Sequence, residues 1–293
     1  MSSAVLTTPA VSPAPLARQR RRIDWGTPLI YVVALAIVGI TVVPVAYIWV
    51  SGFRTTAQLN DNPSAWPSPW ILTNYASVLS SPTFWTEVAN STITAIGTTV
   101  GVVFLGVLAA FVIARYEFRG RDALYSLFTA GLLFPLTVAV LPLYLMLRDL
   151  NLLGTLSGVI IPQIAFALPV TIIILVPFLR AIPGELEDAA SIDGTSRFGF
   201  FWRIVLPLSG PGLVTVGVLA FVGSWNAFLL PLLTLGDPNN YTLPLGVQFF
   251  STQYSQDTAM VLAFTSLAML PAIIFFTIAQ RQIVGGLTGA VKG

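Results

Sequence analysis

The sequence predicts an all-α integral membrane protein with six transmembrane helices. More than half of its 293 residues are hydrophobic and only 9% are charged, and the mean hydropathy of +0.83 is too high for a soluble domain of this size. The apolar residues form six stretches of about 22 to 27 residues, each long enough at 1.5 Å per residue to cross a hydrocarbon core roughly 30 Å thick. The predicted spans cover residues 28–49, 88–114, 123–147, 156–179, 212–235 and 260–283.

The chain outside the spans divides into short terminal segments and loops. Residues 1–25 are predicted to be a disordered basic tail, and residues 284–293 a glycine-rich tail, on either side of a membrane domain over 26–283. The first apolar stretch is too long for the core of a signal peptide, and no small-residue cleavage site follows it, so we expect it to remain as a helix. The loop at 54–86, rich in proline and tryptophan, is expected to form an irregular cap or an interfacial helix.

The distribution of basic residues predicts the orientation. Six spans place both termini on one side of the membrane, and short loops rich in Lys and Arg stay in the cytoplasm. With cytoplasmic termini, the outer side receives only Arg54 and Arg148 of the fourteen Lys and Arg residues. The remaining twelve lie inside: Arg18, Arg20, Arg21, Arg22, Arg115, Arg119, Arg121, Arg180, Arg197, Arg203, Arg281 and Lys292.

The composition also excludes several functions. The chain has no Cys and no His, so it offers no disulfide, thiolate metal site or imidazole base, and we expect no metal site, catalytic residues or cofactor of its own. The only Lys is Lys292 and no G-x-x-x-x-G-K-[ST] string is present, so any ATP hydrolysis must belong to another subunit. Ionisable residues are nearly absent from the predicted spans, which argues against an ion-coupled secondary carrier. A membrane enzyme is disfavoured as well, because no pair of acids lies near the end of a span.

Two features within the spans favour a bundle with closely packed and kinked helices. Gly97 and Gly101 form a G-x-x-x-G pair that lets two helices approach, although this pattern is frequent by chance. Proline is common in membrane helices, but its kinks can also let a bundle rock between two openings. The prolines concerned are Pro135, Pro142, Pro162, Pro169, Pro177, Pro231 and Pro271.

The polar break at 183–207 is predicted to be a helix, a glycine turn and a second helix. Pro183 can open the first helix, the acidic residues after it favour the positive end of the helix dipole, and Gly194 can close the helix in a left-handed conformation. Thr195 or Ser196 can cap the second helix, and Pro207 marks the return to the membrane. An ordinary helical connection remains the alternative for such a loop.

The residues of this loop resemble the cytoplasmic EAA loop of binding-protein-dependent ABC importer permeases, which reads E-A-A, three residues, G, nine residues, I-x-L-P. Every spacing fits, and Asp188 stands where the family usually has Glu. The resemblance implies a coupling helix that docks in a groove of an ATPase subunit. The residues that it assigns to coupling are Glu187, Asp188, Ala189, Ala190, Gly194, Ile204, Leu206 and Pro207.

Three further segments resemble carbohydrate importer permeases of the maltose transporter type. The sequence from Ser224 to Pro231 is similar to W-N-E-F-L-x-P-L, with Ala227 in place of Glu. The segment from Arg115 to Arg121 matches an inner loop R-x-x-F-x-G-R, and the last fourteen residues match a Q-R-x-x-x-x-G-L-T-x-G-A-V-K-G ending that lacks one residue here. A frayed terminus is the alternative for that ending; in the family it reaches toward the ATPase dimer interface.

This resemblance implies a multi-pass subunit of a bacterial-type plasma (inner) membrane that forms part of a sugar or oligosaccharide pathway by alternating access. Its partners would be a second permease subunit, an ABC ATPase dimer that binds ATP and Mg²⁺, an extracytoplasmic sugar-binding protein and membrane lipid, and no nucleic acid. A permease for a polyol, a glycerol phosphodiester or an amino sugar is the alternative within the same class.

Neutral polar residues in the spans are the candidates for lining the pathway, because amides and hydroxyls bind uncharged sugars. At each position a hydrogen bond between helices is the competing role. The candidates are Asn90, Thr94, Gln163 and Asn226.

Overall fold

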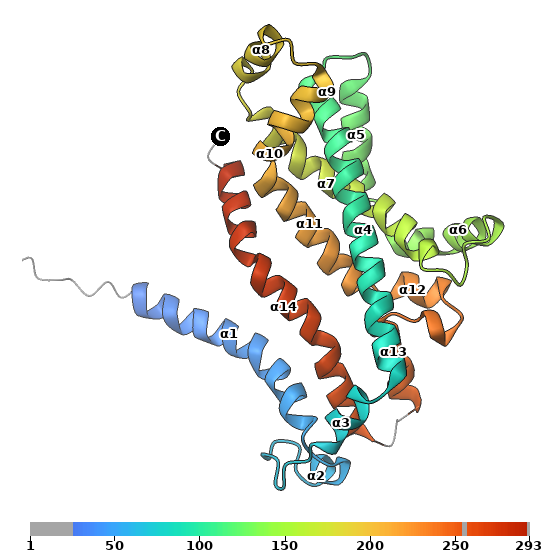
Figure 1. Ribbon diagram of the computed structural model, residues 1–293. Helices are drawn as coiled ribbons and strands as arrows, with labels where there is room; N and C mark the ends of the chain where they lie inside the picture. Colours follow the sequence, from blue (N-terminus) through green and yellow to red (C-terminus); the bar gives the residue numbers. More distant parts are fainter. Residues whose placement is uncertain (1–25, 254–256, 292–293) are drawn as a thin grey trace, which may run out of the picture. The chain divides into compact units, whose positions relative to one another are not determined.

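The computed structural model describes residues 26–253 and 257–291, in which all regular structure is helical (Figure 1). The predicted basic tail over 1–25 lies outside the described residues. The α-helices are α1 (Gly26–Ser51), α2 (Thr56–Asp61), α3 (Thr73–Leu79), α4 (Pro82–Arg115), α5 (Arg121–Gly131), α6 (Leu136–Asp149), α7 (Ser157–Arg180), α8 (Glu185–Ile192), α9 (Arg197–Phe200), α10 (Leu206–Leu208), α11 (Gly210–Trp225), α12 (Leu229–Thr234), α13 (Leu243–Gln253) and α14 (Thr258–Val291). A π-helical turn, η1 (Phe201–Val205), and a 3₁₀ turn, η2 (Pro238–Asn240), complete the set.

The chain divides into two units, residues 1–45 and 46–293. Within the first unit, the part described from Gly26 is the beginning of α1, which is apolar and long enough to cross a membrane.

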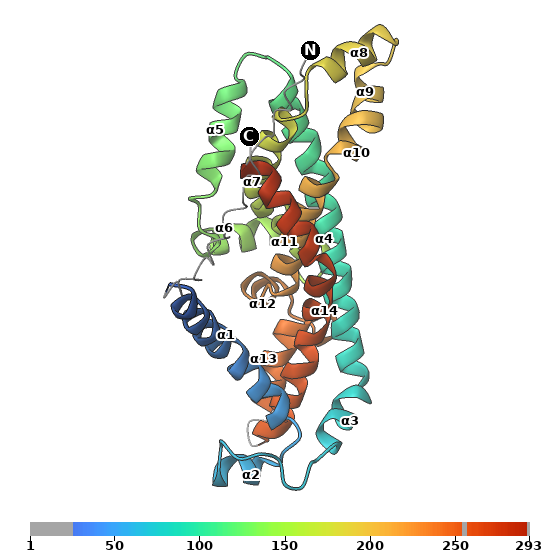
Figure 2. The same cartoon turned by 90° about the vertical axis from the view of Figure 1, so that its left-hand side faces the viewer.

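The second unit is built around α4, α7, α11 and α14, which pack side by side along its length (Figures 1 and 2). Glycine lets α4 and α7 approach closely, because a Cβ added at Gly97 would lie 3.0 Å from Cδ1 of Ile160 and one at Gly101 would overlap Ile164. The close approach predicted for the G-x-x-x-G pair is therefore present. One apolar cluster joins the ends of α4 and α7 to α8 and η1, and a second joins α3, α4, α11 and α14 at the opposite end.

Among the described residues of both units, four helices are long and apolar enough to cross a membrane unbroken, and two bent pairs bring the possible number of spans to six. The third predicted span, 123–147, is not one helix: α5 and α6 are separated at residues 132–135 and differ in direction by 101°. Pro135 explains the break, because it lacks an N–H for the helical ladder and disfavours helical geometry in the residue before it.

The fifth predicted span, 212–235, is also broken. Its first part, α11, ends at Trp225, and α12 begins only at Leu229. Pro231 lies at the third position of α12, where its ring would clash with the carbonyl of Ala227 in a continuous helix. The bent pair that could cross the membrane here runs instead over Arg197–Leu208 and Gly210–Trp225, with an angle of 74°.

Two helices are longer than predicted. The second span, predicted for 88–114, begins at Pro82 and ends at Arg115 as α4. The last span, predicted for 260–283, continues as α14 to Val291, so most of the predicted glycine-rich tail is helical backbone. Residues 292–293 lie outside the described residues.

The loop predicted as a cap contains the short helices α2 and α3, at the end of the unit opposite α8 (Figure 1). The guanidinium of Arg54 is buried there and donates to the carbonyls of Gln58, Asn62 and Pro63. Trp66, Trp70 and Trp85 are exposed, as expected for amphipathic aromatic residues near a membrane interface.

Candidate functional site

The polar break forms a helix, a turn and a second helix at one end of the second unit, where α8 and α9 lie beyond the main bundle (Figures 1 and 2). Gly194 has φ +75° and follows the last turn of α8. The amide of Thr195 donates to the carbonyl of Ala190 at 2.8 Å, and that of Gly194 donates to Ser191 at 3.1 Å. These two bonds form a Schellman motif, so the predicted left-handed cap is confirmed.

The second helix begins with a side-chain cap. The Oγ of Ser196 accepts a bond of 3.1 Å from the amide of Gly199, which selects Ser196 from the two predicted capping residues. After α9 the chain widens into the π-helical turn η1, in which the amide of Leu206 bonds to the carbonyl of Phe201. This wider turn precedes Pro207, whose missing N–H could not continue a regular ladder.

The loop has an inner and an outer apolar face. Ala190 and Phe200 are buried in the cluster that also contains the ends of α4 and α7. By contrast, Ile192 is 86% exposed and Phe198 is 72% exposed, and Leu186, Ala189 and Trp202 are exposed as well. The two alanines of the motif therefore point to different surroundings, and only Ala189 is free to contact another protein. Ile204 and Leu206 are half-buried against the cluster, whereas Pro207 is exposed.

Glu187 is oriented toward α4 and remains partly exposed. The Nε and one terminal nitrogen of Arg115 donate to its Oε2 at 3.1 and 2.8 Å, and the other terminal nitrogen donates to the carbonyl of Ile182 at 2.8 Å. The side chains of Arg115 and Glu187 are 8% and 29% exposed. Asp188 is exposed, so of the two neighbouring acids it is the one available to a partner.

Aromatic rings surround this ion pair. The guanidinium carbon of Arg115 lies 5.8 Å from the centre of the Phe200 ring, and that of Arg197 lies 5.2 Å from the Tyr116 ring. Burial raises the pKa of the Tyr116 hydroxyl, and the negative charge of Glu187 adds to the rise, so Tyr116 is neutral at physiological pH. Sequence reasoning did not select Arg115 for the site, although it is the first residue of the R-x-x-F-x-G-R segment.

Two of the four pathway candidates lie on α4. The Nδ2 of Asn90 donates to the carbonyls of Asn239 at 2.8 Å and Tyr241 at 3.0 Å, so Asn90 joins α4 to the loop before α13. Thr94 is buried one turn further along, and its hydroxyl has no hydrogen-bond partner in the part of the chain that the structure describes. Both residues are thus inside the protein.

Gln163 joins three helices. Its Oε1 accepts from the hydroxyl of Thr98 on α4 at 2.9 Å and from that of Ser224 on α11 at 2.5 Å. These residues line a cleft of about 370 Å³ together with Phe166 and Phe228. The amide nitrogen of Gln163 is buried without a partner among the described residues, which leaves its two N–H donors unused beside the cleft.

Asn226 lies in the break between α11 and α12. Its Nδ2 donates to the carbonyl of Val222, one turn earlier in its own helix, at 2.9 Å, and the side chain is exposed. Asn226 lines a second cleft of about 380 Å³ with Trp225, Gln248 and Thr265. Phe228 borders both clefts, so the clefts lined by Gln163 and by Asn226 are neighbours at the break between α11 and α12.

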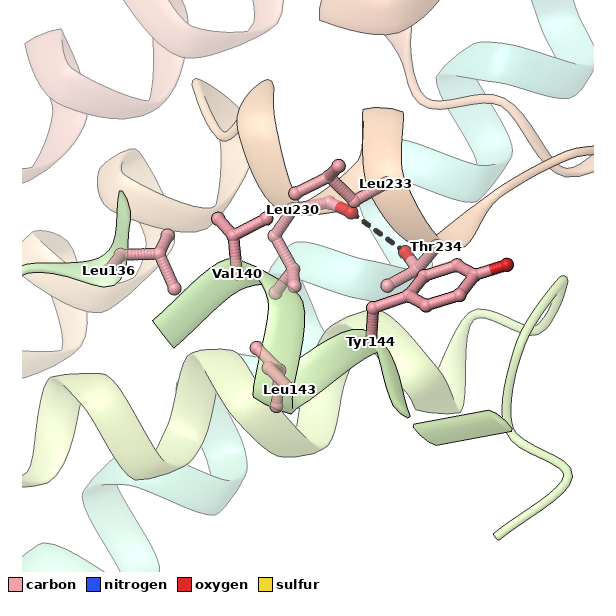
Figure 3. Close-up of a pocket in the computed structure, with 7 residues that line it drawn as sticks. All are labelled: Leu136, Val140, Leu143, Tyr144, Leu230, Leu233 and Thr234. Atoms are coloured by element: carbon pink, nitrogen blue, oxygen red, sulfur yellow. Dashed lines mark hydrogen bonds between the residues drawn. The ribbon is translucent and has the colours of Figure 1, made fainter. Parts of the chain in front are cut away.

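A third depression, between α6 and α12, is different in kind. It is lined by Leu136, Val140, Leu143, Tyr144, Leu230, Leu233 and Thr234 (Figure 3). The hydroxyl of Thr234 donates a hydrogen bond of 2.8 Å to the carbonyl of Leu230, and the depression has no room for a water molecule. It is a packing contact that holds the two broken segments together and not a ligand site.

A bundle of apolar helices that carries this helix–glycine turn–helix element defines a membrane transport subunit, and comparison with known proteins agrees. Residues 101–288 match the model of the family described as "binding-protein-dependent transport system inner membrane component". The chain belongs to this family. It is therefore an inner-membrane permease component of a transport system that depends on a binding protein, and not an enzyme.

Relatives resemble the chain over most of its length. It is 36% identical to the trehalose transport system permease SugB of Mycobacterium tuberculosis, over 88% of this chain and 94% of that protein. It is 32% identical to the diacetylchitobiose uptake permease NgcG of Streptomyces coelicolor, over 85% of this chain and 83% of that protein. A crystal structure of a bacterial ABC transporter that imports the polysaccharide alginate contains a chain of the same fold, with a TM-score of 0.76 at 22% identity, covering 94% of this chain and 99% of that one.

Proposed function

We propose that this permease forms part of the import pathway for a neutral sugar or oligosaccharide. The observation that carries the proposal is the lining of the two clefts beside the α11–α12 break, which contains amides, hydroxyls and aromatic rings but no ionisable side chain. Such groups bind sugars by hydrogen bonds to hydroxyls and by stacking on the rings. The relatives support the same class, since their names specify trehalose and diacetylchitobiose.

The energy for import comes from hydrolysis of ATP, which the partner ATPase binds together with Mg²⁺. Helix α8 passes the movement of the ATPase to the membrane helices. The exposed apolar side chains of Leu186, Ala189, Ile192, Phe198 and Trp202 support this role, because apolar surface exposed outside the membrane favours contact with another protein. The α8 end is then cytoplasmic, in agreement with the split of the basic residues.

Reconstitution tests the proposal. The permease, expressed with its partner subunits and its binding protein in vesicles, should take up a labelled neutral disaccharide or oligosaccharide only when ATP and the binding protein are both supplied. A glycerol phosphodiester serves as the charged comparison. Uptake that follows a proton or sodium gradient without ATP, or uptake of the phosphodiester alone, would refute the proposal.

A further inference from the structure

We propose that α4 carries the movement of the coupling helix across the membrane domain, with Arg115 as the positioning residue that attaches α8 to it. This inference rests on the proposed function. It adds a route for the movement of α8 that the backbone of the loop alone does not provide. In the sequence α8 is flanked by α7 and by the segment that leads to α11, so those helices are its covalent connections. The ion pair gives it a third connection, to α4.

The first step is the attachment at the α8 end. Arg115 is the last residue of α4, and its guanidinium binds both Glu187 on α8 and the carbonyl of Ile182 just before α8. A cation at this position also complements the negative end of the α4 dipole. Because the pair is largely withdrawn from water, two donors on one carboxylate oxygen hold α8 more firmly than an exposed pair would.

The second step is the helix itself. The only proline among the 34 residues of α4 is Pro82, at its first position, whereas α7 has three internal prolines and α14 has one. Proline removes ladder hydrogen bonds and allows bending, so a displacement applied at one end of α7 or α14 can be absorbed along the helix. In α4 the ladder is continuous, and a displacement at Arg115 reaches the other end.

The third step is the attachment at the far end. Asn90 holds the carbonyls of Asn239 and Tyr241, and the adjacent Ser91 accepts from the amide of Leu243 at 2.7 Å. These bonds fix residues 239–243, where the chain enters α13, to α4. Ser91 and Arg115 are 24 residues apart, which corresponds to about 36 Å along a helix. A single rigid helix thus joins the coupling loop to a segment on the opposite side of the molecule.

The test follows this distant segment during the ATPase cycle. The chain has no cysteine of its own, and a Cβ added at Gly236 meets no atom within 4 Å, so Gly236→Cys provides a reporter in the purified complex with the ATPase. Its rate of modification by a maleimide is measured without nucleotide and with a non-hydrolysable ATP analogue. The background with native Arg115 should show a change in this rate on nucleotide binding.

Arg115→Gln in the same background should assemble and bind nucleotide, but the ratio of the two rates should fall to about one, and coupled uptake should fall about tenfold. Arg119→Gln is the matched control, since Arg119 is exposed in the loop that follows α4, four residues after Arg115, and it should keep the ratio. If Arg115→Gln does not assemble, Glu187→Gln is tested in its place. It removes the negative charge of the carboxylate and keeps an oxygen that can accept a hydrogen bond from Arg115. An assembled variant that retains the full nucleotide response overturns the inference. Failure of the native chain to retain an ATPase would instead refute the proposed function.

Discussion

The hydroxyl of Ser224 donates to the Oε1 of Gln163 at 2.5 Å and so joins α11 to α7 one residue before α11 ends. Thr98 donates to the same oxygen from α4. Three of the four central helices therefore meet at one side-chain amide, next to the place where Pro231 prevents α11 from continuing. Hydrogen bonds thus hold the bundle together at the level where α11 ends, and the two clefts that share Phe228 lie beside this break.

Gly194→Ala should weaken coupling. The left-handed conformation at φ +75° costs a residue with a Cβ roughly 1 kcal/mol or more, and relief of that strain would misdirect α9. Gly184→Ala is a matched control, because both glycines have free space around an added Cβ but Gly184 has φ −66°. We expect ATP-dependent uptake to fall in Gly194→Ala and to persist in Gly184→Ala at equal abundance in the membrane. Equal uptake by the two variants would contradict the coupling role of the turn.

The outer face of the loop should determine association with the ATPase. Ile192→Ser and Phe198→Ser alter exposed side chains and should leave the permease folded, yet reduce the amount of ATPase that co-purifies. Phe200→Ala provides the contrast, since Phe200 is 2% exposed and its truncation should cost the permease itself about 3 kcal/mol or more. Thermal stability of the isolated permease, measured beside the yield of complex, separates the two effects. Normal co-purification of both serine variants would argue against docking through this face.

The orientation gives a prediction for intact cells. Ser64→Cys and Ser191→Cys each introduce the only thiol of the chain, at exposed positions near α2 and on α8. If basic loops stay inside, an impermeant maleimide should label Ser64→Cys in intact cells and Ser191→Cys only after permeabilisation. Labelling of Ser191→Cys in intact cells would reverse the topology.

The sequence predicted those features that depend on local chemistry. Gly194 could be assigned because a glycine after a short helix is the usual residue of a left-handed cap, and the pattern of apolar stretches predicted the helical membrane domain. The breaks at residues 132–135 and 226–228 were missed because hydropathy stays high across them. A proline in an apolar stretch is compatible with either a kink or a complete break, and tertiary packing, such as that of α6 against α12, decides between them.

Contacts between residues far apart in the sequence could not be predicted from local sequence patterns. The resemblance assigned Glu187 to coupling, but no local pattern indicated that its carboxylate binds Arg115, 72 residues earlier in the sequence. Burial of Ala190 rather than Ala189 was likewise unpredictable. In a short helix with an alanine on each of two sides, neither side is strongly favoured to face the interior. Arg115 could have been selected by asking which carboxylate would neutralise a cation at the end of an apolar helix.

Asn226 and Gln163 should respond differently to loss of their amides. The Nδ2 of Asn226 binds Val222 within α11, so Asn226→Leu breaks no described bond between helices and should leave assembly intact while lowering sugar uptake. Gln163→Leu removes the acceptor of Thr98 and Ser224, and each lost bond between membrane helices costs typically about 0.6 kcal/mol, so assembly and uptake should fall together. Complex yield and uptake of two related sugars, measured in the same membranes, distinguish the roles. A pathway role for Asn226 predicts a larger loss for one sugar than for the other, whereas a parallel loss of yield and of both uptakes would show that Asn226 only supports the fold.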